Sequence, residues 1–288
     1  MTKYMCKAVE SRIPQIIRLA RATIMAMTSK TPNGPKLLDG TEVAAFIKQR
    51  HAQVVAGLAK KPKLAIIRSE HNLAGDKYLK MKRAYGEDIG VTVDLYVEAT
   101  AGILGRIDSL NHDQSVTGII IQLPLENRDV TDKVLAAVDP RKDVDGLAPG
   151  SPFEPGTVKA ALWLLAAYNV AIAGRIVIVG QGRLVGKPLA DRLESSGHEV
   201  VRADIRTADL AALTRTADMV FTGTGRPDLI TSDMVKDGAT IIDTGAPLGE
   251  LDPVLYDRPS LTLTPNPGGV GPMTVASLFD NLLIAAAK

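Results

Sequence analysis

Short apolar runs alternate with helical stretches along most of the chain, and this alternation limits the possible folds more than any other feature. The pattern is typical of βα units built around a parallel sheet. The runs expected to form strands are 63–68, 91–97, 116–122, 175–180, 199–203, 219–222, 239–243 and 261–264. The segments expected to form helices are 41–58, 74–89, 101–111, 157–168 and 273–287, with Thr41 as a candidate N-cap. The predicted fold class is therefore α/β.

A break in this pattern divides the chain in two. Residues 139–155 are dense in proline, glycine and aspartate and show little periodicity, so they form the best candidate for a domain boundary. With 288 residues, 45% of them hydrophobic, the chain is long enough for two globular domains. No run of about 18 apolar residues occurs, and only 4% of residues are aromatic. Neither a membrane span nor a nucleic-acid-binding surface is therefore favoured.

The basic charge of the chain is concentrated at its start. Residues 1–26 hold five basic residues and one acidic residue, whereas the remainder holds 29 basic and 31 acidic residues. Residues 11–27 are interpreted as a basic helix, which is either an organelle-targeting segment, a helix packed on the body, or translated sequence before a true start at Met27. The last two interpretations are favoured, because an internal Pro14 and few serines are not typical of a targeting peptide. Cys6 is the only cysteine, so no intrachain disulfide can form and a cytoplasmic location fits.

A glycine-rich turn follows the predicted strand at 175–180. Its sequence is Gly180-Gln-Gly182-Arg-Leu-Val-Gly186-Lys-Pro188, and a helix is expected to start near Pro188. Small residues at such a turn let the backbone approach a pyrophosphate, and the helix N-terminus supplies N–H donors. The spacing is GxGxxxG, and a plain tight turn is the alternative. The position between strand and helix favours a Rossmann-like dinucleotide site.

Asp204 stands at the end of the next predicted strand, about 24 residues after the turn. A carboxylate there can accept hydrogen bonds from the adenosine ribose and would repel a 2′-phosphate. A solvated loop aspartate is an equally good interpretation. Arg202 and Arg206 flank Asp204 and can instead hold a phosphate. The cofactor is therefore NAD or NADP, and the residues lean toward NAD.

Three stretches outside the glycine turn are candidates for a substrate site. Tyr78 and Lys82 are spaced to share one face of a helix, although a surface lysine beside a half-buried tyrosine is the plainer interpretation. Gln122 begins Gln-Leu-Pro-Leu at a strand end, where ligands bind in open α/β sheets. The third is Lys142-Asp-Val-Asp145-Gly146, most simply an acidic turn.

Together with Pro267-Gly-Gly-Val-Gly-Pro-Met-Thr274, these motifs occur in an order that resembles the methylenetetrahydrofolate dehydrogenase/cyclohydrolase family. The resemblance extends from Leu38-Asp-Gly40 to the C-terminal helix. It implies a dehydrogenase that oxidises a tetrahydrofolate one-carbon unit and hydrolyses the product, with no metal and a homodimeric assembly. Two domains are expected: a folate-binding domain at 37–147, joined by the helix 273–288, and a Rossmann-like domain at 148–272, after an extension at 1–36.

The resemblance also implies roles for single residues. Lys82 would be the catalytic lysine, tuned by Gln122, while Tyr78 lies against the folate and Asp145 bonds the pterin ring. The remaining expected contacts fall into two groups. Substrate contacts are expected from Leu123, Pro124, Pro267, Gly268, Gly269, Pro272 and Thr274, in a cleft between the domains. Cofactor contacts are expected from Gly180, Gln181, Gly182, Val185, Gly186, Asp204, Arg206 and Thr224.

The chain departs from the family pattern at four places. Gly75 replaces a serine near the lysine, and Gln181 replaces an arginine that would bind phosphate. Ala203-Asp-Ile205 replaces Cys-His-Ser, and the connection 147–158 is shortened. The two changes around the cofactor agree with NAD, whereas the family default is NADP. Two rival functions are another two-domain nicotinamide dehydrogenase, such as a shikimate dehydrogenase-like enzyme, and a non-catalytic folate- or nucleotide-binding protein.

Overall fold

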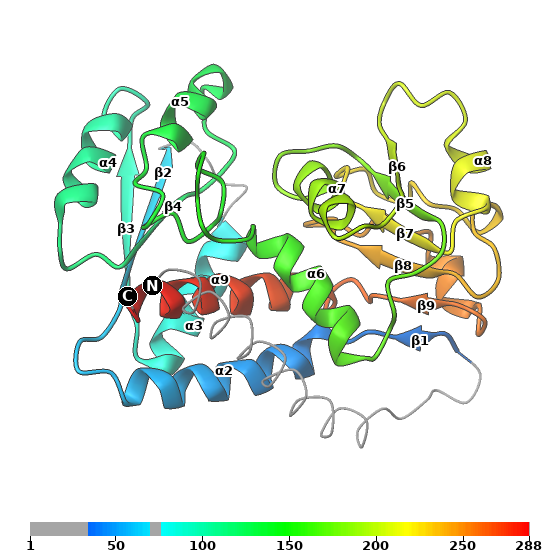
Figure 1. Ribbon diagram of the computed structural model, residues 1–288, viewed down its shortest axis with the longest axis horizontal. Helices are drawn as coiled ribbons and strands as arrows, with labels where there is room; N and C mark the ends of the chain where they lie inside the picture. Colours follow the sequence, from blue (N-terminus) through cyan, green and yellow to red (C-terminus); the bar gives the residue numbers. More distant parts are fainter. Residues whose placement is uncertain (1–33, 70–75, 288) are drawn as a thin grey trace. The chain divides into compact units, whose positions relative to one another are not determined.

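The computed structural model describes residues 34–69 and 76–287 (Figure 1). The helix predicted at 11–27, Cys6 and Gly75 lie outside these residues. The chain divides into two compact units. Unit 1 comprises the residues up to Ala45 together with Thr157–Thr274, and unit 2 comprises Phe46–Gly156 together with Val275–Lys288.

Unit 1 is built on a six-stranded sheet in the order β1-β9-β8-β7-β5-β6, and every pairing in it is parallel. The strands are β1 (Lys36–Leu37), β5 (Ile176–Val179), β6 (Val200–Ala203), β7 (Met219–Thr222), β8 (Thr240–Asp243) and β9 (Thr262–Leu263). Buried residues point to both faces of β5, β7 and β8, which explains why these strands are continuous apolar runs. The chain leaves β5 toward β6 on one side and continues to β7 on the other, so β5 and β7 flank a topological switch point.

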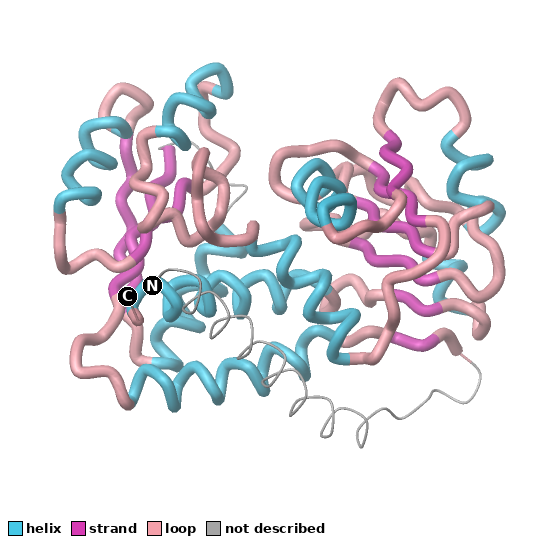
Figure 2. The backbone as a smooth tube through the Cα atoms, viewed as in Figure 1, coloured by secondary structure: helices cyan, strands magenta, loops and turns pink. Residues whose placement is uncertain are grey.

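Helices and short 3-10 turns cover this sheet (Figure 2). On one face, α8 and the two 3-10 turns pack on alternate residues of β5, β7 and β8 through a cluster that includes Val177, Val220 and Ile241. The elements of unit 1 outside the sheet are α6 (Gly156–Ala167), α7 (Gly186–Ser195), α8 (Leu210–Arg215), η2 (Ser232–Met234) and η3 (Pro253–Asp257). Helix α6 takes its first residue from unit 2.

Unit 2 contains a three-stranded parallel sheet in the order β3-β2-β4. Helices α4 and α5 cover one face through Ile103, Ile107 and Val134, whereas Leu282 of α9 lies against Gly118 of β4. The strands are β2 (Lys63–Ser69), β3 (Thr92–Glu98) and β4 (Gly118–Ile121). The helices are α3 (Asp76–Ile89), α4 (Ile103–His112), η1 (Arg128–Val130) and α5 (Thr131–Ala136). Helices α2 (Gly40–Ala56) and α9 (Val270–Ala286) contribute residues to both units.

The predicted α/β class is confirmed, and each predicted strand and helix after residue 36 has a counterpart. Helix α3 ends at Ile89, the last residue of the predicted segment 74–89, and Gly90 follows it with a φ of +78°. The N-cap assigned to Thr41 is wrong, because Thr41 already lies inside α2. The Asp39 carboxylate accepts the Thr41 N–H at 2.7 Å instead. Within the described part of the chain, no helix is long and apolar enough to cross a membrane.

Candidate active site

Lys82 and Gln122 form the centre of the candidate site in unit 2. Lys82 lies on α3 and is only 6% exposed, and its Nζ donates a hydrogen bond to Gln122 Oε1 at 2.9 Å. Gln122 follows β4, where its backbone N–H donates to Ile67 O at 2.8 Å and so continues the β4–β2 ladder. Its Nε2 donates to Leu123 O at 3.2 Å, which directs Oε1 toward the lysine. The plainer interpretation of Lys82 as a surface lysine is therefore wrong.

The charges around Lys82 oppose one another. Burial lowers the pKa of Lys82, because the ammonium loses its hydration, while the carboxylate of Asp145 acts in the opposite direction. Burial likewise raises the pKa of Asp145, and the Lys82 ammonium opposes that shift. Lys82 and Asp145 therefore interact electrostatically in a poorly hydrated place. A lysine in such surroundings can release and recover a proton more readily than a solvated one.

Three further predicted substrate contacts lie next to Lys82 and Gln122 in the sequence. Tyr78 lies one turn before Lys82 on α3 and is half-buried, and that burial raises the pKa of its phenol. Leu123 and Pro124 follow Gln122 directly, with Pro124 exposed and the peptide bond between them cis. These three expected contacts therefore come from one helix and from the end of one strand.

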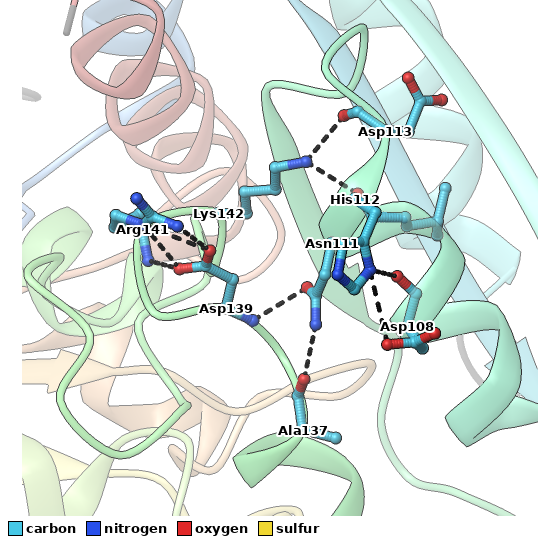
Figure 3. A network of polar contacts seen from close by, with 9 residues as sticks. Asp108, Asn111, His112, Asp113, Ala137, Asp139, Arg141 and Lys142 are labelled. Atoms are coloured by element: carbon cyan, nitrogen blue, oxygen red, sulfur yellow. Dashed lines mark hydrogen bonds and ion pairs between the residues drawn. The ribbon is translucent and has the colours of Figure 1, made fainter.

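A polar network at the end of α4 holds the turn that precedes Asp145 in the chain (Figure 3). Lys142 does not point to a substrate: its Nζ donates to the carbonyl oxygens of Leu110 at 2.8 Å and Asp113 at 2.7 Å, capping α4. Asn111 donates to Ala137 O and accepts from the Asp139 N–H, which fixes the preceding turn (Figure 3). The motif Lys142–Gly146 is thus a turn, as the plainest interpretation had it, and its side chains are bonded to the surrounding elements.

Helix α9 holds the other side of the same loop. Asn281 Nδ2 donates to Val144 O and Glu154 O, each at 3.0 Å. This buried amide therefore links the residue before Asp145 to the far end of the connection that follows it. The Asp143 carboxylate accepts the Ala148 N–H at 2.7 Å inside the loop. The shortened connection is therefore closed by bonds within unit 2.

The glycine turn of unit 1 requires glycine at two of its three positions. Gly180 has a φ of +92°, and a Cβ there would lie 2.8 Å from Gly223 O. A Cβ at Gly186 would overlap the carbonyl oxygen of Gly180, whereas a Cβ at Gly182 would meet no atom within 4 Å. Helix α7 starts at Gly186, directly after Val185, so the turn leads from β5 into a helix N-terminus as predicted.

Two residues predicted to bind the cofactor direct their side chains into the protein instead. Gln181 Nε2 donates to the carbonyl oxygens of Ile178 at 3.1 Å and Gly180 at 3.2 Å. The hydroxyl of Thr224 donates to Glu250 Oε2 at 2.8 Å. Because these side chains are bonded within the protein, any contact of Gln181 or Thr224 with a cofactor would come mainly from the backbone.

Asp204 follows β6 and forms an ion pair with Arg206. The Arg206 N–H donates to Asp204 Oδ1 at 2.8 Å, and its guanidinium Nη2 donates to Oδ2 at 2.8 Å. These bonds lower the pKa of Asp204, so its carboxylate is ionised. The guanidinium of Arg202 is held by two carboxylates of α7. Its Nη2 lies 2.6 Å from Asp191 Oδ1 and 2.6 Å from Glu194 Oε2. The alternative role of Arg202 as a phosphate ligand is not favoured by these contacts.

The segment expected to contact substrate near the C-terminus lies in unit 1, in the loop before α9 and in its first turns. Gly268 has a φ of +110°, and its carbonyl accepts the Gly40 N–H at 2.8 Å. A Cβ on Gly40 would overlap the carbonyl oxygen of Gly269. The Leu38-Asp-Gly40 motif therefore anchors this loop. The predicted contacts located here are Pro267, Gly268, Gly269, Pro272 and Thr274.

Two buried carboxylates at the end of the unit 1 sheet were not predicted as site residues. Glu250 is 0% exposed and Asp243 is 3% exposed. The Asp243 carboxylate accepts the N–H groups of Gly245 at 2.7 Å and Glu250 at 2.8 Å. Burial raises the pKa of Asp243 to about 6, and the neighbouring Glu250 carboxylate adds to the shift. The sequence signal that could have pointed to them is a polar residue at the end of three neighbouring strand segments: Thr222 in β7, Asp243 in β8 and Thr264 after β9.

This raised pKa makes the stability contributed by Asp243 depend on pH. The folded state holds the proton between the unfolded value of 3.8 and about 6, so this carboxyl favours folding at low pH and loses that contribution as pH rises. Asp243→Asn, which cannot titrate, is expected to be more destabilising at pH 4.5 than at pH 7.5 by about 2 kcal/mol. Urea unfolding of both proteins at the two pH values measures this; a difference that is independent of pH contradicts it.

Comparison with known proteins agrees with the assignments made in each of the two units. The model of the tetrahydrofolate dehydrogenase/cyclohydrolase catalytic domain matches residues 38–145, and that of the family's NAD(P)-binding domain matches residues 155–288. The bifunctional protein FolD of Bordetella avium is 36% identical over 280 residues, which cover 88% of this chain and 98% of the relative.

Solved structures lead to the same family. The bifunctional FolD of Campylobacter jejuni superposes with a TM-score of 0.82 at 34% identity, covering 88% of this chain and 98% of its own. The Trypanosoma brucei enzyme, solved with NADP and an inhibitor, gives 0.81 at 26% identity with the same coverage.

The shikimate dehydrogenase alternative is not favoured. Shikimate 5-dehydrogenase of Thermus thermophilus reaches a TM-score of 0.52 at 18% identity, covering 78% of this chain and 98% of its own, which shows a shared fold alone. The non-catalytic alternative is not favoured either, because Lys82, Gln122 and Asp145 come together in unit 2. With both of its domain models matched in order, the chain belongs to the tetrahydrofolate dehydrogenase/cyclohydrolase family.

Proposed function

We propose that the protein oxidises 5,10-methylenetetrahydrofolate to the 5,10-methenyl form with a nicotinamide cofactor and hydrolyses that product to 10-formyltetrahydrofolate. The observation that carries this proposal is the buried Lys82 amine, held by Gln122 at 2.9 Å beside the Asp145 carboxylate. Measuring the appearance and decay of methenyl-tetrahydrofolate absorbance with the purified protein tests both reactions. Absence of methenyl formation with either NAD or NADP would contradict the proposal.

The oxidation needs positioning more than acid–base chemistry. A hydride leaves the carbon that bridges two folate nitrogens, and a nitrogen lone pair stabilises the cation that develops. The protein therefore has to align this carbon with the cofactor, whose nicotinamide accepts the hydride when bound. In unit 1 the Gly180–Gly186 turn and the start of α7 fit a dinucleotide, because they bring backbone N–H groups to one place.

The hydrolysis needs a group that moves protons. Water adds to the methenyl carbon, and one carbon–nitrogen bond then breaks to leave the formyl group on the other nitrogen. Lys82 takes one proton of the attacking water and returns it to the departing nitrogen, a role that its lowered pKa supports, while the remaining hydroxyl proton is released to solvent as the formyl C=O forms. Gln122 holds the amine without adding charge. Asp145 accepts hydrogen bonds from the donor edge of the pterin, with Tyr78, Leu123 and Pro124 as neighbouring contacts.

NAD is the proposed cofactor, although the family default is NADP. An ionised Asp204 at the end of β6 would repel a 2′-phosphate, and Ile205 beside it is apolar and 98% exposed. Arg202 is engaged by Asp191 and Glu194, and Arg206 by Asp204 itself. The two arginines nearest this position are thus already neutralised.

This cofactor assignment makes a prediction for Asp204→Ser. The wild-type protein is expected to favour NAD over NADP in kcat/KM by at least about tenfold, and the variant is expected to lower that ratio about tenfold or more. The substitution removes the repelling carboxylate and releases Arg206 for a phosphate. Initial rates at matched cofactor concentrations measure the ratio.

The double variant Asp204→Ser with Arg206→Ala serves as the control. It should lose the gain in NADP use, because the released guanidinium is gone. A strong NADP preference in the wild type, or an unchanged ratio in Asp204→Ser, contradicts the assignment.

Two broader features of the proposal rest on resemblance and composition. A homodimer is expected from the family resemblance and is measured by light scattering of the purified protein. A cytoplasmic location is supported by the single cysteine of the chain.

A further inference from the structure

Glu250 is a fully buried acidic residue whose carboxylate accepts hydrogen bonds from the residues at the end of β7. It lies in the connection between β8 and β9 and is 0% exposed. Its Oε1 accepts the N–H groups of Thr224 and Gly225, each at 2.6 Å. Its Oε2 accepts the hydroxyls of Thr222 and, at 2.8 Å, Thr224. These four uncharged donors replace the hydrogen bonds to water that the carboxylate loses when it is buried.

The loop held by Glu250, residues 222–225, lies directly against the glycine turn. A Cβ on Gly180 would lie 2.8 Å from Gly223 O and 2.9 Å from Thr224 Cγ2. On the other side, a Cβ on Gly223 would lie 3.4 Å from the Cβ of Val185. The loop 222–225 therefore touches the turn both where it leaves β5 and where it enters α7.

This contact is at the place where a ligand is expected. β5 and β7 are neighbours in the sheet. The strand that follows β5 in the chain, β6, lies on one side of β5, and the next strand, β7, lies on the other. In open α/β sheets, ligands bind beyond the carboxyl ends of the two strands at such a switch point. The Gly180–Gly186 turn lies beyond the end of β5 and the loop 222–225 beyond the end of β7, so they border the same crevice.

We propose that Glu250 is a positioning residue for the nicotinamide cofactor, which fixes the loop 222–225 as the wall opposite the Gly180–Gly186 turn. The inference rests on the proposed function, because it assumes a dinucleotide in this crevice. Asp243 supports Glu250 in turn by accepting its backbone N–H at 2.8 Å. The support thus runs from Asp243 to Glu250, then to Thr224 and Gly225, and from there to the turn.

A merely structural role for Glu250 would predict a loss of stability without a selective loss of cofactor affinity. The proposal predicts that affinity falls together with the order of the loop 222–225. Glu250→Ala removes both carboxylate oxygens that accept hydrogen bonds from the loop. Glu250→Gln retains one carbonyl oxygen, which can still accept both N–H groups, while its amide can donate to the two hydroxyls. The glutamine variant should therefore be much the milder.

Asp252→Ala is a matched control. Asp252 is also an acidic residue whose carboxylate caps a backbone N–H, accepting from Val254 at 3.0 Å at the start of η3. It lies two residues from Glu250, and its carboxylate accepts a hydrogen bond within its own turn rather than from the end of β7. Its loss should cost stability of the usual capping size without changing the cofactor crevice.

The experiment combines calorimetric titration with NAD and amide hydrogen exchange of the cofactor-free protein. Glu250→Ala is expected to weaken NAD binding about tenfold or more and to speed exchange in residues 222–226, while leaving the binding of a folate analogue unchanged. Glu250→Gln is expected to weaken NAD binding by about threefold, and Asp252→Ala should behave as the wild type in both measurements.

Unchanged NAD affinity in folded Glu250→Ala, or an equal loss in Asp252→Ala, overturns the inference. If Glu250→Ala does not fold, Glu250→Gln decides: wild-type affinity and wild-type exchange at residues 222–226 then overturn it. A wild-type protein that binds neither NAD nor NADP would instead overturn the proposed function itself. Exchange at residues 222–226 in the cofactor-free variants does not depend on that function, so the two failures are distinguishable.

Discussion

Replacing Lys82 by methionine is expected to abolish hydrolysis of methenyl-tetrahydrofolate while leaving hydride transfer measurable. General acid–base groups contribute about 10²- to 10⁴-fold to a rate, so hydrolysis should fall at least about a hundredfold. Hydride transfer draws on a nitrogen lone pair of the substrate and on alignment, so it should fall by no more than about tenfold. Methionine fills much of the volume of the lysine stem without its amine. Absorbance of the methenyl product separates formation from decay.

Lys80→Met is the matched control for this prediction. Lys80 lies on α3 two residues before Lys82, and its side chain is exposed. The same change there should leave both reactions at their wild-type rates. Hydrolysis by Lys82→Met at the wild-type rate would show that another group moves the protons.

The lowered pKa of Lys82 gives this prediction a second readout. Burial disfavours its ammonium form, so the neutral amine is available at lower pH than for a solvated lysine. Hydrolysis in the wild type should therefore rise with pH along a limb whose midpoint is below 10.5, and that limb should be missing in Lys82→Met. A limb that persists in the variant belongs to a different group.

Local signals in the sequence were sufficient for the regular elements and for the glycine turn. Strands such as β5 and β7 are buried on both faces, so they appear as unbroken apolar runs bounded by turn residues. The Tyr78–Lys82 spacing depends only on the helical period, and Gln122 only on its place at a strand end. These predictions needed neighbours in sequence rather than in space.

The features that were missed depend on contacts between distant residues. Glu250 bonds the loop that begins 28 residues earlier, and Asp243 is buried by its own sheet and by the segment around Glu250. Asp39 was overlooked as a cap because Thr41, two residues later, is also a residue type that caps helices. β1 has only two residues and pairs with β9 at the other end of the chain. No periodicity can reveal such pairings.

The opposite roles of Gly186 and Gly182 give the second large prediction. Gly186→Ala is expected to destabilise the cofactor-free protein by about 3 kcal/mol or more, because its methyl group would overlap the Gly180 carbonyl oxygen. Relieving this overlap requires the turn to move away from the end of β5, so NAD binding should weaken at least about a hundredfold. Urea unfolding and calorimetric titration with NAD measure the two effects.

Gly182→Ala places the same methyl group four residues earlier, in the same turn, with no atom within 4 Å of it. Its φ lies outside the left-handed region, so alanine adopts it without strain and the free energy of unfolding should change by no more than about 0.5 kcal/mol. Equal unfolding midpoints for the two variants would mean that the backbone of the turn yields freely. The close approach of α7 to β5 would then not be what shapes the cofactor site. A large difference between two alanines in one turn isolates that approach from the general cost of losing a glycine.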